Sequence, residues 1–487
     1  MLKSLPRIIL ASLETSLLFD KEKYIKQGIN KNSMSEEEHR LIAQRKQKLA
    51  LLRKQGINPY PSSFHKKDYA KDILEKFKKL KKEEKTNNKV SIGGRIMTLR
   101  VMGKAGFAHL QDFTGKIQIY AREDQLGKED YKLFSKLDLG DIIGAEGVVF
   151  RTQKGEVSVW VKKLVLLAKN LRPLPEKWHG LKDIEARYRQ RYLDLIVNPE
   201  VMEIFLKRAK IIDAMREFLV NNGFVNVETP ILQPIYGGTN ARPFKSFLQN
   251  LKMDVYMRIS NELYLKRLIV GGYEKVFEFS YDFRNEGIDT THNPEFLQME
   301  TMWAYADYKD NMKFTEDMFF YICKKALGKT NFNFQDKKID LKKPWKKMSM
   351  IAALKEYANI NAESLGVNGI IELLNKHKIK FDKSITWGIG VALLFEELVE
   401  SKLVQPTIIY DYPVETSPLA KINSRDPRFV ERFEVYLNGW EIANSYSELN
   451  DPEVLLNNWK EQENKAKSGD EEAQRMDKDF LTALEIG

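Results

Sequence analysis

Residues 90–167 alternate between apolar and polar residues, and this pattern restricts the possible folds of the chain more than any other feature. Alternation with period two is typical of short strands that have one buried face. The segment contains five such stretches: VSIGGRIMTLR, GFAHLQD, KIQIYAR, DIIGAEGVVFR and EVSVWVKKLVL. Gly103 with Gly106, Thr114-Gly115 and Lys154-Gly155 mark turns between them. The pattern predicts a small barrel of five strands.

A helical stretch, DYKLFSKLDLG, separates the third predicted strand from the fourth. Five strands with a helix in that place have the order of an OB-fold, a barrel that binds single-stranded nucleic acid. On pattern alone, any other small β-barrel remains an alternative. Residues 35–55 precede the barrel and read as a charged helix, whose basic face suits either phosphates or solvent.

The charge balance indicates the kind of binding partner, and the single cysteine excludes some kinds of site. Lys and Arg number 79 against 68 Asp and Glu, and the net charge of +11 suits a polyanionic partner, although a solvated lysine surface gives the same balance. Cys323 alone cannot form an intramolecular disulfide or a cysteine-cluster zinc site. No apolar run approaches the roughly 18–20 residues of a membrane span. We therefore expect a cytoplasmic protein without a membrane segment.

Residues 283–296, FRNEGIDTTHNPEF, place four side chains that can contact phosphates or a base within the length of one strand, a loop and a second strand. An arginine can hold a phosphate in a bidentate fork, a histidine can reach a second phosphate, and an aromatic ring can stack on a base. The chain has no G-x-x-x-x-G-K-[ST] string, which excludes a Walker-type phosphate cradle. The string predicts a nucleotide triphosphate grip, and a hairpin with a salt-bridged arginine is the alternative. Its candidate residues are Arg284, Glu286, His292 and Phe296.

Beyond Lys182 the chain reads as a long mixed region of helices and strands. A helix over residues 202–223 places Phe205, Ile212, Met215 and Leu219 on one apolar face. Strands are expected over residues 224–232, 407–410 and 432–437. Helices are expected over residues 311–327 and 390–402, and two more helices are expected within residues 350–377.

Several strings resemble the class II aminoacyl-tRNA synthetases. GFVNVETPIL resembles their motif 1, and FRNEGIDTTHNPEF followed by QMETMWAYADY resembles motif 2. An OB-fold placed before the core is the arrangement of the aspartyl, asparaginyl and lysyl subgroup. Residues 35–487 resemble the lysyl enzymes in particular. The strings that carry this resemblance are RYRQRYLDLI, GGTNARPF, ELYLKRLIVGGYEKVFE, YPVETSPLA and EIANSYSELND.

The resemblance implies an α+β multidomain fold, with an N-terminal OB-fold β-barrel followed by the antiparallel β-sheet core and flanking helices of a class II synthetase. The expected domains are an unstructured extension over 1–33, a helical segment over 34–89, an anticodon-binding OB-fold over 90–172 and a catalytic core over 173–487. Residues 1–33 could instead be a degenerate targeting sequence. Motif 1 implies a homodimer.

The implied activity is that of a lysine–tRNA ligase, which makes lysyl-adenylate from L-lysine and ATP and transfers lysine to tRNA(Lys). By resemblance Arg284 and His292 are catalytic, gripping the α- and γ-phosphates, while Glu286 meets the adenine edge and Phe296 stacks on adenine. The ammonium groups of lysine require carboxylates, because a desolvated ammonium is costly without a paired anion. The implied lysine-binding residues are Glu262 and Glu300 for the α-amino group, Glu448 for the side chain, and Asn444 and Tyr446.

The resemblance also implies a metal and an anticodon contact. Glu434 and Glu441 match magnesium-binding carboxylates, and Mg²⁺ prefers such oxygen ligands together with substrate phosphates. Phe107 matches a position that stacks on an unstacked base, although core packing would also explain it. The other implied anticodon contacts are Arg95, Gln118 and Glu156.

The chain departs from the family pattern at several positions. Met302 stands in place of a tyrosine, and the lost hydroxyl is expected to weaken lysine binding. Motif 3, with its arginine, would follow Gly487, so a truncated and catalytically impaired product is expected. A tRNA-binding paralogue and a lysine ligase with a non-tRNA acceptor are the alternatives. The other departures are Thr239, Trp440 and the string Phe247-Leu248-Gln249.

Overall fold

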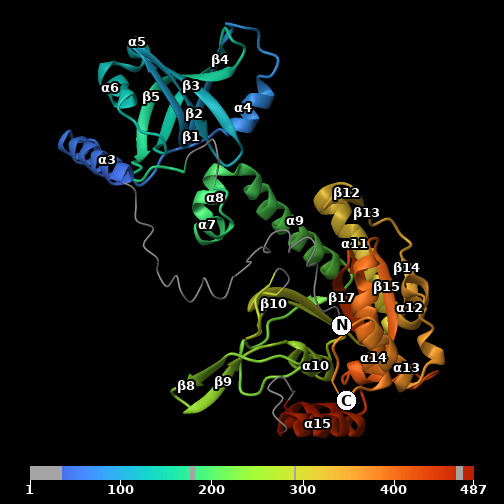
Figure 1. The fold of residues 1–487 in the computed structure, drawn as a ribbon. Helices are drawn as coiled ribbons and strands as arrows, with labels where there is room; N and C mark the ends of the chain where they lie inside the picture. The colour runs from blue at the N-terminus through green and yellow to red at the C-terminus, as the bar shows by residue number, and fades with distance from the viewer. Residues whose placement is uncertain (1–35, 176–180, 290–291, 383, 468–474) are drawn as a thin grey trace. The chain divides into compact units, whose positions relative to one another are not determined.

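The computed structural model describes residues 36–175, 181–289, 292–382, 384–467 and 475–487. They form two compact units that divide between Asn198 and Pro199 (Figure 1). The predicted extension over residues 1–33 lies outside the described residues. None of the described helices combines the length and the apolar character needed to cross a membrane.

The first unit is built around a closed five-stranded barrel in the order β1-β2-β3-β5-β4 (Figure 1). Side chains of β2 and β3 are buried at every second position, as the period-two pattern requires. The five predicted strands and the helical stretch after the third are confirmed. The elements are β1 (Lys85–Met102), β2 (Ala105–Gln111), β3 (Lys116–Arg122), α5 (Glu123–Leu126), α6 (Lys128–Ser135), β4 (Ile142–Arg151) and β5 (Val157–Ala168).

The assignment of Gly106 to a turn is wrong. Gly103 forms the turn, with a φ of 56°, whereas Gly106 lies inside β2. A Cβ atom at Gly106 would stand 2.6 Å from Cε1 of Phe134, so glycine here allows the buried ring from α6 to pack on the strand. The remaining helices of the unit are α3 (Glu36–Lys54), which confirms the predicted helix over 35–55, α4 (Ala70–Lys76), α7 (Ile184–Arg189) and α8 (Arg191–Val197).

Two sheets of the second unit carry the candidate site. One has the order β11-β10-β6 and the other the order β14-β15-β16-β17. Their strands are β6 (Val225–Asn226), β10 (Lys275–Phe283), β11 (Glu295–Trp303), β14 (Lys346–Ser349), β15 (Thr407–Pro413), β16 (Phe429–Leu437) and β17 (Trp440–Tyr446). A third sheet and a hairpin are formed by β7 (Leu232–Gln233), β8 (Lys245–Leu248), β9 (Met253–Met257), β12 (Asn331–Phe334) and β13 (Lys337–Asp340).

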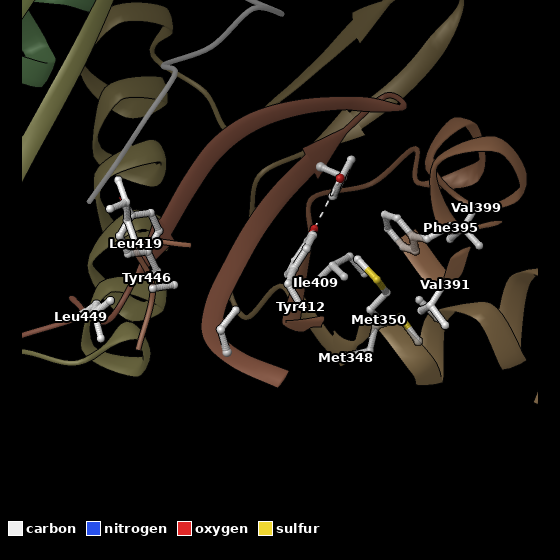
Figure 2. Packing of buried hydrophobic residues seen from close by; sticks show 14 of the residues in the cluster. Met348, Met350, Val391, Phe395, Val399, Ile409, Tyr412, Leu419, Tyr446 and Leu449 are labelled. Carbon is white, nitrogen blue, oxygen red and sulfur yellow. Dashed lines mark hydrogen bonds between the residues drawn. The ribbon is translucent and has the colours of Figure 1, made fainter. Parts of the chain in front are cut away.

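Helices cover both faces of the β14–β17 sheet. Successive residues of a strand face opposite sides, so Ile409 joins the core formed with α12, α13 and α14, while Ile408 joins the core formed with α9 and α11. In Figure 2, Leu419, Tyr446 and Leu449 lie at one end of the first core and Val391, Phe395 and Val399 at the other. The helices are α9 (Pro199–Asn221), α10 (Glu262–Val270), α11 (Tyr308–Ile322), α12 (Met350–Ala358), α13 (Val367–Lys376), α14 (Trp387–Leu398), α15 (Pro452–Lys467) and α16 (Lys478–Ile486).

Some elements of this unit differ from the sequence predictions. The expected strand over 224–232 is reduced to β6 and β7, because these two pieces pair with different partners, β10 and β9. In α9 the predicted core residue Phe205 is 36% exposed, whereas Phe218, which the prediction omitted, is 9% exposed. Strand β17 was not predicted, since Glu441 and Asn444 interrupt its apolar pattern.

Candidate functional site

One face of the β10–β11 pair carries polar side chains. Directly opposed residues of antiparallel strands share a face, and so do residues two apart in one strand. Asp282 lies opposite Phe296, and Glu278 lies opposite Glu300. All four therefore share one face, which gathers the predicted residues Phe296 and Glu300, and Arg284 follows two residues after Asp282.

Arg284 and Phe296 form a stacked pair at the end of this face. The guanidinium carbon of Arg284 lies 5.1 Å from the centroid of the Phe296 ring. The main-chain nitrogen of Arg284 donates to the carbonyl of Pro294 over 2.9 Å, and its Nε donates to the carbonyl of Ile259 over 3.4 Å. These contacts hold a planar cation beside an aromatic surface, an arrangement suited to a phosphate and a base.

The other two predicted nucleotide residues lie in the exposed loop between β10 and β11. Asp289 accepts the main-chain N–H of His292 over 2.7 Å and also pairs with its Nδ1 over 2.7 Å. This contact fixes the orientation of the imidazole ring. Glu286 is exposed, and its N–H donates to the carbonyl of Arg284 over 2.9 Å. Residues 290–291 of the loop lie outside the described residues.

A buried ion network adjoins the stacked pair. Nη1 of Arg258 lies 2.9 Å from Oε1 of Glu278, and Nε lies 3.3 Å from Oδ1 of Asp282. These three side chains are at most 5% exposed. Burial raises the pKa of Asp282 to about 6, against the opposing attraction of Arg258 and Arg284. The network is therefore electrostatically coupled to the Arg284 clamp.

Predicted lysine-binding carboxylates meet near the start of α10. Glu262 is the first residue of the helix, is completely buried, and accepts hydrogen bonds from the Tyr446 hydroxyl and, over 2.8 Å, from Lys266 Nζ. Lys266 also forms an ion pair with Glu448. Glu300, likewise completely buried, accepts from Nε2 of Gln298 over 2.9 Å.

A cavity of about 200 Å³ adjoins this cluster. Gly238 brings its loop against the start of α10: its φ is 90°, and a Cβ there would lie 3.1 Å from the Cβ of Glu262. Tyr446 forms part of the cavity wall, as do Asn444 and Arg432 from the same sheet. The remaining lining residues are Thr239, Asn240, Thr416, Ser417, Pro418, Leu419 and Ala420.

Glu434 lies on the same face of the β16–β17 pair as the predicted pocket residue Asn444, because the two residues are directly opposed. It accepts hydrogen bonds from Asn444 Nδ2 over 3.2 Å and from the Tyr412 hydroxyl over 2.9 Å. Glu441 lies opposite Tyr436, across a register shift. No group of three or more His, Cys, Asp or Glu side chains in the described part of the chain is arranged as a metal site.

Three of the predicted anticodon contacts meet on the outer face of the barrel. Phe107 stacks on Tyr120 with ring centroids 4.5 Å apart and planes at 24°. Nε2 of Gln118 donates to Oε2 of Glu156 over 2.7 Å. Nε2 of His109 lies 2.8 Å from Oε1 of the same glutamate. These contacts place a partly exposed aromatic ring beside amide and carboxylate groups.

Arg95 does not join that group. It lies opposite Gln111, whereas Phe107 lies opposite Arg100, so the two predicted contacts occupy different ends of the β1–β2 pair. Nη1 of Arg95 donates to the carbonyl of Gly140 over 2.8 Å, and burial lowers the pKa of its guanidinium.

Comparison with known proteins identifies the family. The family model for class II tRNA synthetases (D, K and N) matches residues 183–487. The chain belongs to the class II tRNA synthetases. The model for the OB-fold nucleic acid binding domain matches residues 90–167, so the α+β fold with an N-terminal OB-fold is confirmed.

Similar proteins cover nearly the whole of this synthetase. The lysine–tRNA ligase of Carboxydothermus hydrogenoformans is 49% identical over 93% of this chain and 92% of its own length. That of Pelotomaculum thermopropionicum is 49% identical over 94% of this chain and 90% of its own. The lysine–tRNA ligase of Halalkalibacterium halodurans is 47% identical over 92% of this chain and 90% of its own length.

The sequence prediction missed several residues that contact the candidate site. Arg258, Lys266 and Asp289 each pair with a candidate residue or its neighbour. The spacing of Glu278, Ser280 and Asp282 along one strand was a usable signal, since polar residues at period two on a buried strand need partners. No local pattern identifies Arg258 as their partner.

Proposed function

We propose that this synthetase is a lysine–tRNA ligase that uses ATP to join L-lysine to tRNA(Lys). The observation that carries the proposal is the gathering of Glu262 and Glu448 beside a tyrosine, in the unit that also holds the Arg284–Phe296 clamp. Buried carboxylates favour an amino acid with a second ammonium group. The identity to lysine–tRNA ligases supports the same substrate.

In the proposed site, Arg284 would grip the α-phosphate and Phe296 would stack on adenine. Glu286 would meet the adenine edge, and His292, oriented by Asp289, would contact the γ-phosphate. The lysine pocket would be formed by Glu262, Glu300, Asn444, Tyr446 and Glu448.

The proposed reaction has two steps and uses no protein nucleophile. First, a carboxylate oxygen of lysine attacks the α-phosphorus, the bond between that phosphorus and the leaving pyrophosphate breaks, and lysyl-adenylate forms. Next, a terminal ribose hydroxyl of tRNA attacks the carbonyl carbon of the adenylate, the bond between that carbon and the phosphate oxygen breaks, AMP leaves, and the hydroxyl proton passes to solvent. Positioning and charge neutralisation supply the rate. Cys323 does not take part, since burial raises the pKa of its thiol to about 12.

Glu434 and Glu441 are the proposed Mg²⁺ ligands. Their surroundings are acidic, since the pKa of Glu400 is raised to about 8, first by burial and further by the like charges of Glu434, Glu396 and Glu441. Arg432 already pairs with Glu434, so a metal ion would share that carboxylate with it. Carboxylates shared with triphosphate oxygens are the ligands that Mg²⁺ prefers. When bound, Mg²⁺ would neutralise phosphate charge.

A homodimer in the cytoplasm is part of the proposal. Apolar side chains from the end of α9 to β7 and beyond are exposed, as expected of a surface that a second copy covers. They are Val220, Val225, Ile231, Leu232 and Ile235, each between 37% and 54% exposed.

Lysine-dependent exchange of labelled pyrophosphate into ATP tests the proposed function. We expect exchange with lysine and Mg²⁺, and charging of tRNA(Lys) when tRNA is added, and this result would contradict the impaired product expected from the sequence. Aspartate and asparagine are the matched controls, because the family model covers synthetases for all three amino acids. Exchange with aspartate or asparagine but not lysine would contradict the proposal. Exchange without tRNA charging would instead favour a lysine ligase with another acceptor.

Phe107→Ala is expected to raise KM for tRNA(Lys) in aminoacylation by about 10-fold or more while leaving pyrophosphate exchange unchanged, because stacking is worth about 1–3 kcal/mol per base. Steady-state aminoacylation measures this effect. Phe113→Ala is the control, since Phe113 is 61% exposed at the turn after β2. Equal KM values for tRNA(Lys) in the two variants would show that Phe107 does not contact the tRNA.

A further inference from the structure

Lys266 places a protein ammonium group among the carboxylates of the lysine pocket. It follows Glu262 by one turn of α10, and its Nζ lies 2.8 Å from Oε1 of Glu262. The same nitrogen forms an ion pair with Oε2 of Glu448 and lies 5.6 Å from the centroid of the Tyr446 ring. One ammonium therefore bridges two of the carboxylates proposed to receive the two ammonium groups of the substrate.

This bridge differs from an ordinary pair within a helix. Exposed pairs four residues apart stabilise a helix by only about 0.2–0.5 kcal/mol. Here the Lys266 side chain is 12% exposed and that of Glu262 is fully buried, and the second partner comes from a distant part of the chain. Burial alone would lower the pKa of Lys266, but Glu262 and Glu448 raise it above its usual value. Lys266 therefore stays charged in the pocket.

The two partners of Lys266 differ in how firmly other side chains hold them. Glu262 is fully buried, whereas the Glu448 side chain is 33% exposed. The two carboxylate oxygens of Glu448 are themselves buried, but the ion pair with Lys266 holds Glu448, whereas Glu262 is held by both Lys266 and Tyr446. Glu448 is therefore the partner that Lys266 can exchange.

The charges of the pocket balance only when Lys266 is included. Glu262, Glu300 and Glu448 carry three negative charges, and the substrate brings two ammonium groups for them. Lys266 supplies the third positive charge, which the buried carboxylates need.

We propose that Lys266 is a resident counter-ion that bridges Glu262 and Glu448 in the free protein, and that the side-chain ammonium of incoming lysine displaces it from Glu448. This inference rests on the proposed function. Lys266 is then a positioning and affinity-setting residue: it keeps the carboxylates in place and makes lysine compete for one of them. Since displacement costs free energy, lysine binds more weakly than it would to a pocket without the bridge.

Calorimetric titration of the full chain with L-lysine, without ATP, tests this exchange. Lys266→Met and Lys266→Gln remove the competing charge, and we expect each to lower the Kd for lysine by about fivefold, the effect of a partly exposed ion pair. The gain should shrink at acidic pH, because carboxylates that have lost their cation take up protons more readily. A purely structural role would not produce this pH dependence.

Lys266→Arg completes the series and remains informative if the neutral variants fail to fold. The planar fork of arginine holds carboxylates more firmly than an ammonium does, so we expect a higher Kd than that of the wild type. Weaker or unchanged lysine binding in the folded neutral variants, or a Kd in Lys266→Arg at or below the wild-type value, would overturn the exchange. Absence of lysine binding to the wild type would instead refute the proposed function.

Discussion

Arg284→Ala is expected to lower kcat/KM for lysine-dependent pyrophosphate exchange by about 10²–10³-fold, the usual loss when one preorganised donor to a developing charge is removed. Arg284 is held by its main-chain bond to Pro294 and by stacking on Phe296. In the proposed reaction it would contact the α-phosphate, where charge builds up as pyrophosphate leaves. Most of the loss should therefore appear in kcat rather than in KM for ATP.

Two control variants test whether the loss of exchange comes from the Arg284 contact itself or from the loss of a positive charge in general. Arg284→Lys keeps the charge but loses the planar fork, so it should recover only part of the rate. Arg428→Ala removes an exposed arginine that pairs with Asp426, and it should leave exchange nearly unchanged. If Arg284→Ala kept exchange within threefold of the wild type, the residue would not be the phosphate clamp.

The barrel could be predicted from sequence because its pattern is local. Each strand buries every second side chain, so the strand period and the turn residues are visible within a few positions. The same holds for the Arg284–Phe296 string, since a hairpin brings residues that are close in sequence onto one face. Here sequence neighbours are also spatial neighbours.

The remaining parts of the site depend on contacts between distant segments. Strand β17 was missed because Glu441 and Asn444 break its apolar pattern, and its position is set by pairing with β16. Lys266 meets Glu448 only after α10 and the end of that sheet come together. The failure of the predicted strand over 224–232 has a similar cause, because its two ends belong to different sheets.

Arg258→Met is expected to lower the free energy of unfolding by about 3–5 kcal/mol, because removing one partner of a buried ion pair leaves an uncompensated charge. Arg258 is 3% exposed and compensates two carboxylates, Glu278 and Asp282. Methionine has a similar length, so cavity formation adds little. Urea denaturation at pH 8, followed by the fluorescence of the tryptophans, measures the change, with Arg428→Met as the control at an exposed ion pair, expected to cost below about 1 kcal/mol.

The pH dependence of this loss distinguishes charge from packing. Arg258 holds down the pKa of Asp282, which burial has already raised to about 6. Without Arg258, that pKa rises further in the folded protein and stays unchanged in the unfolded chain. The folded state then binds a proton that the unfolded state has lost, so stability falls as pH rises through the interval between the two values. The variant should therefore lose less stability, relative to the wild type, at pH 5 than at pH 8. An equal loss at both values would mean that packing, and not the buried charge of Asp282, makes Arg258 necessary.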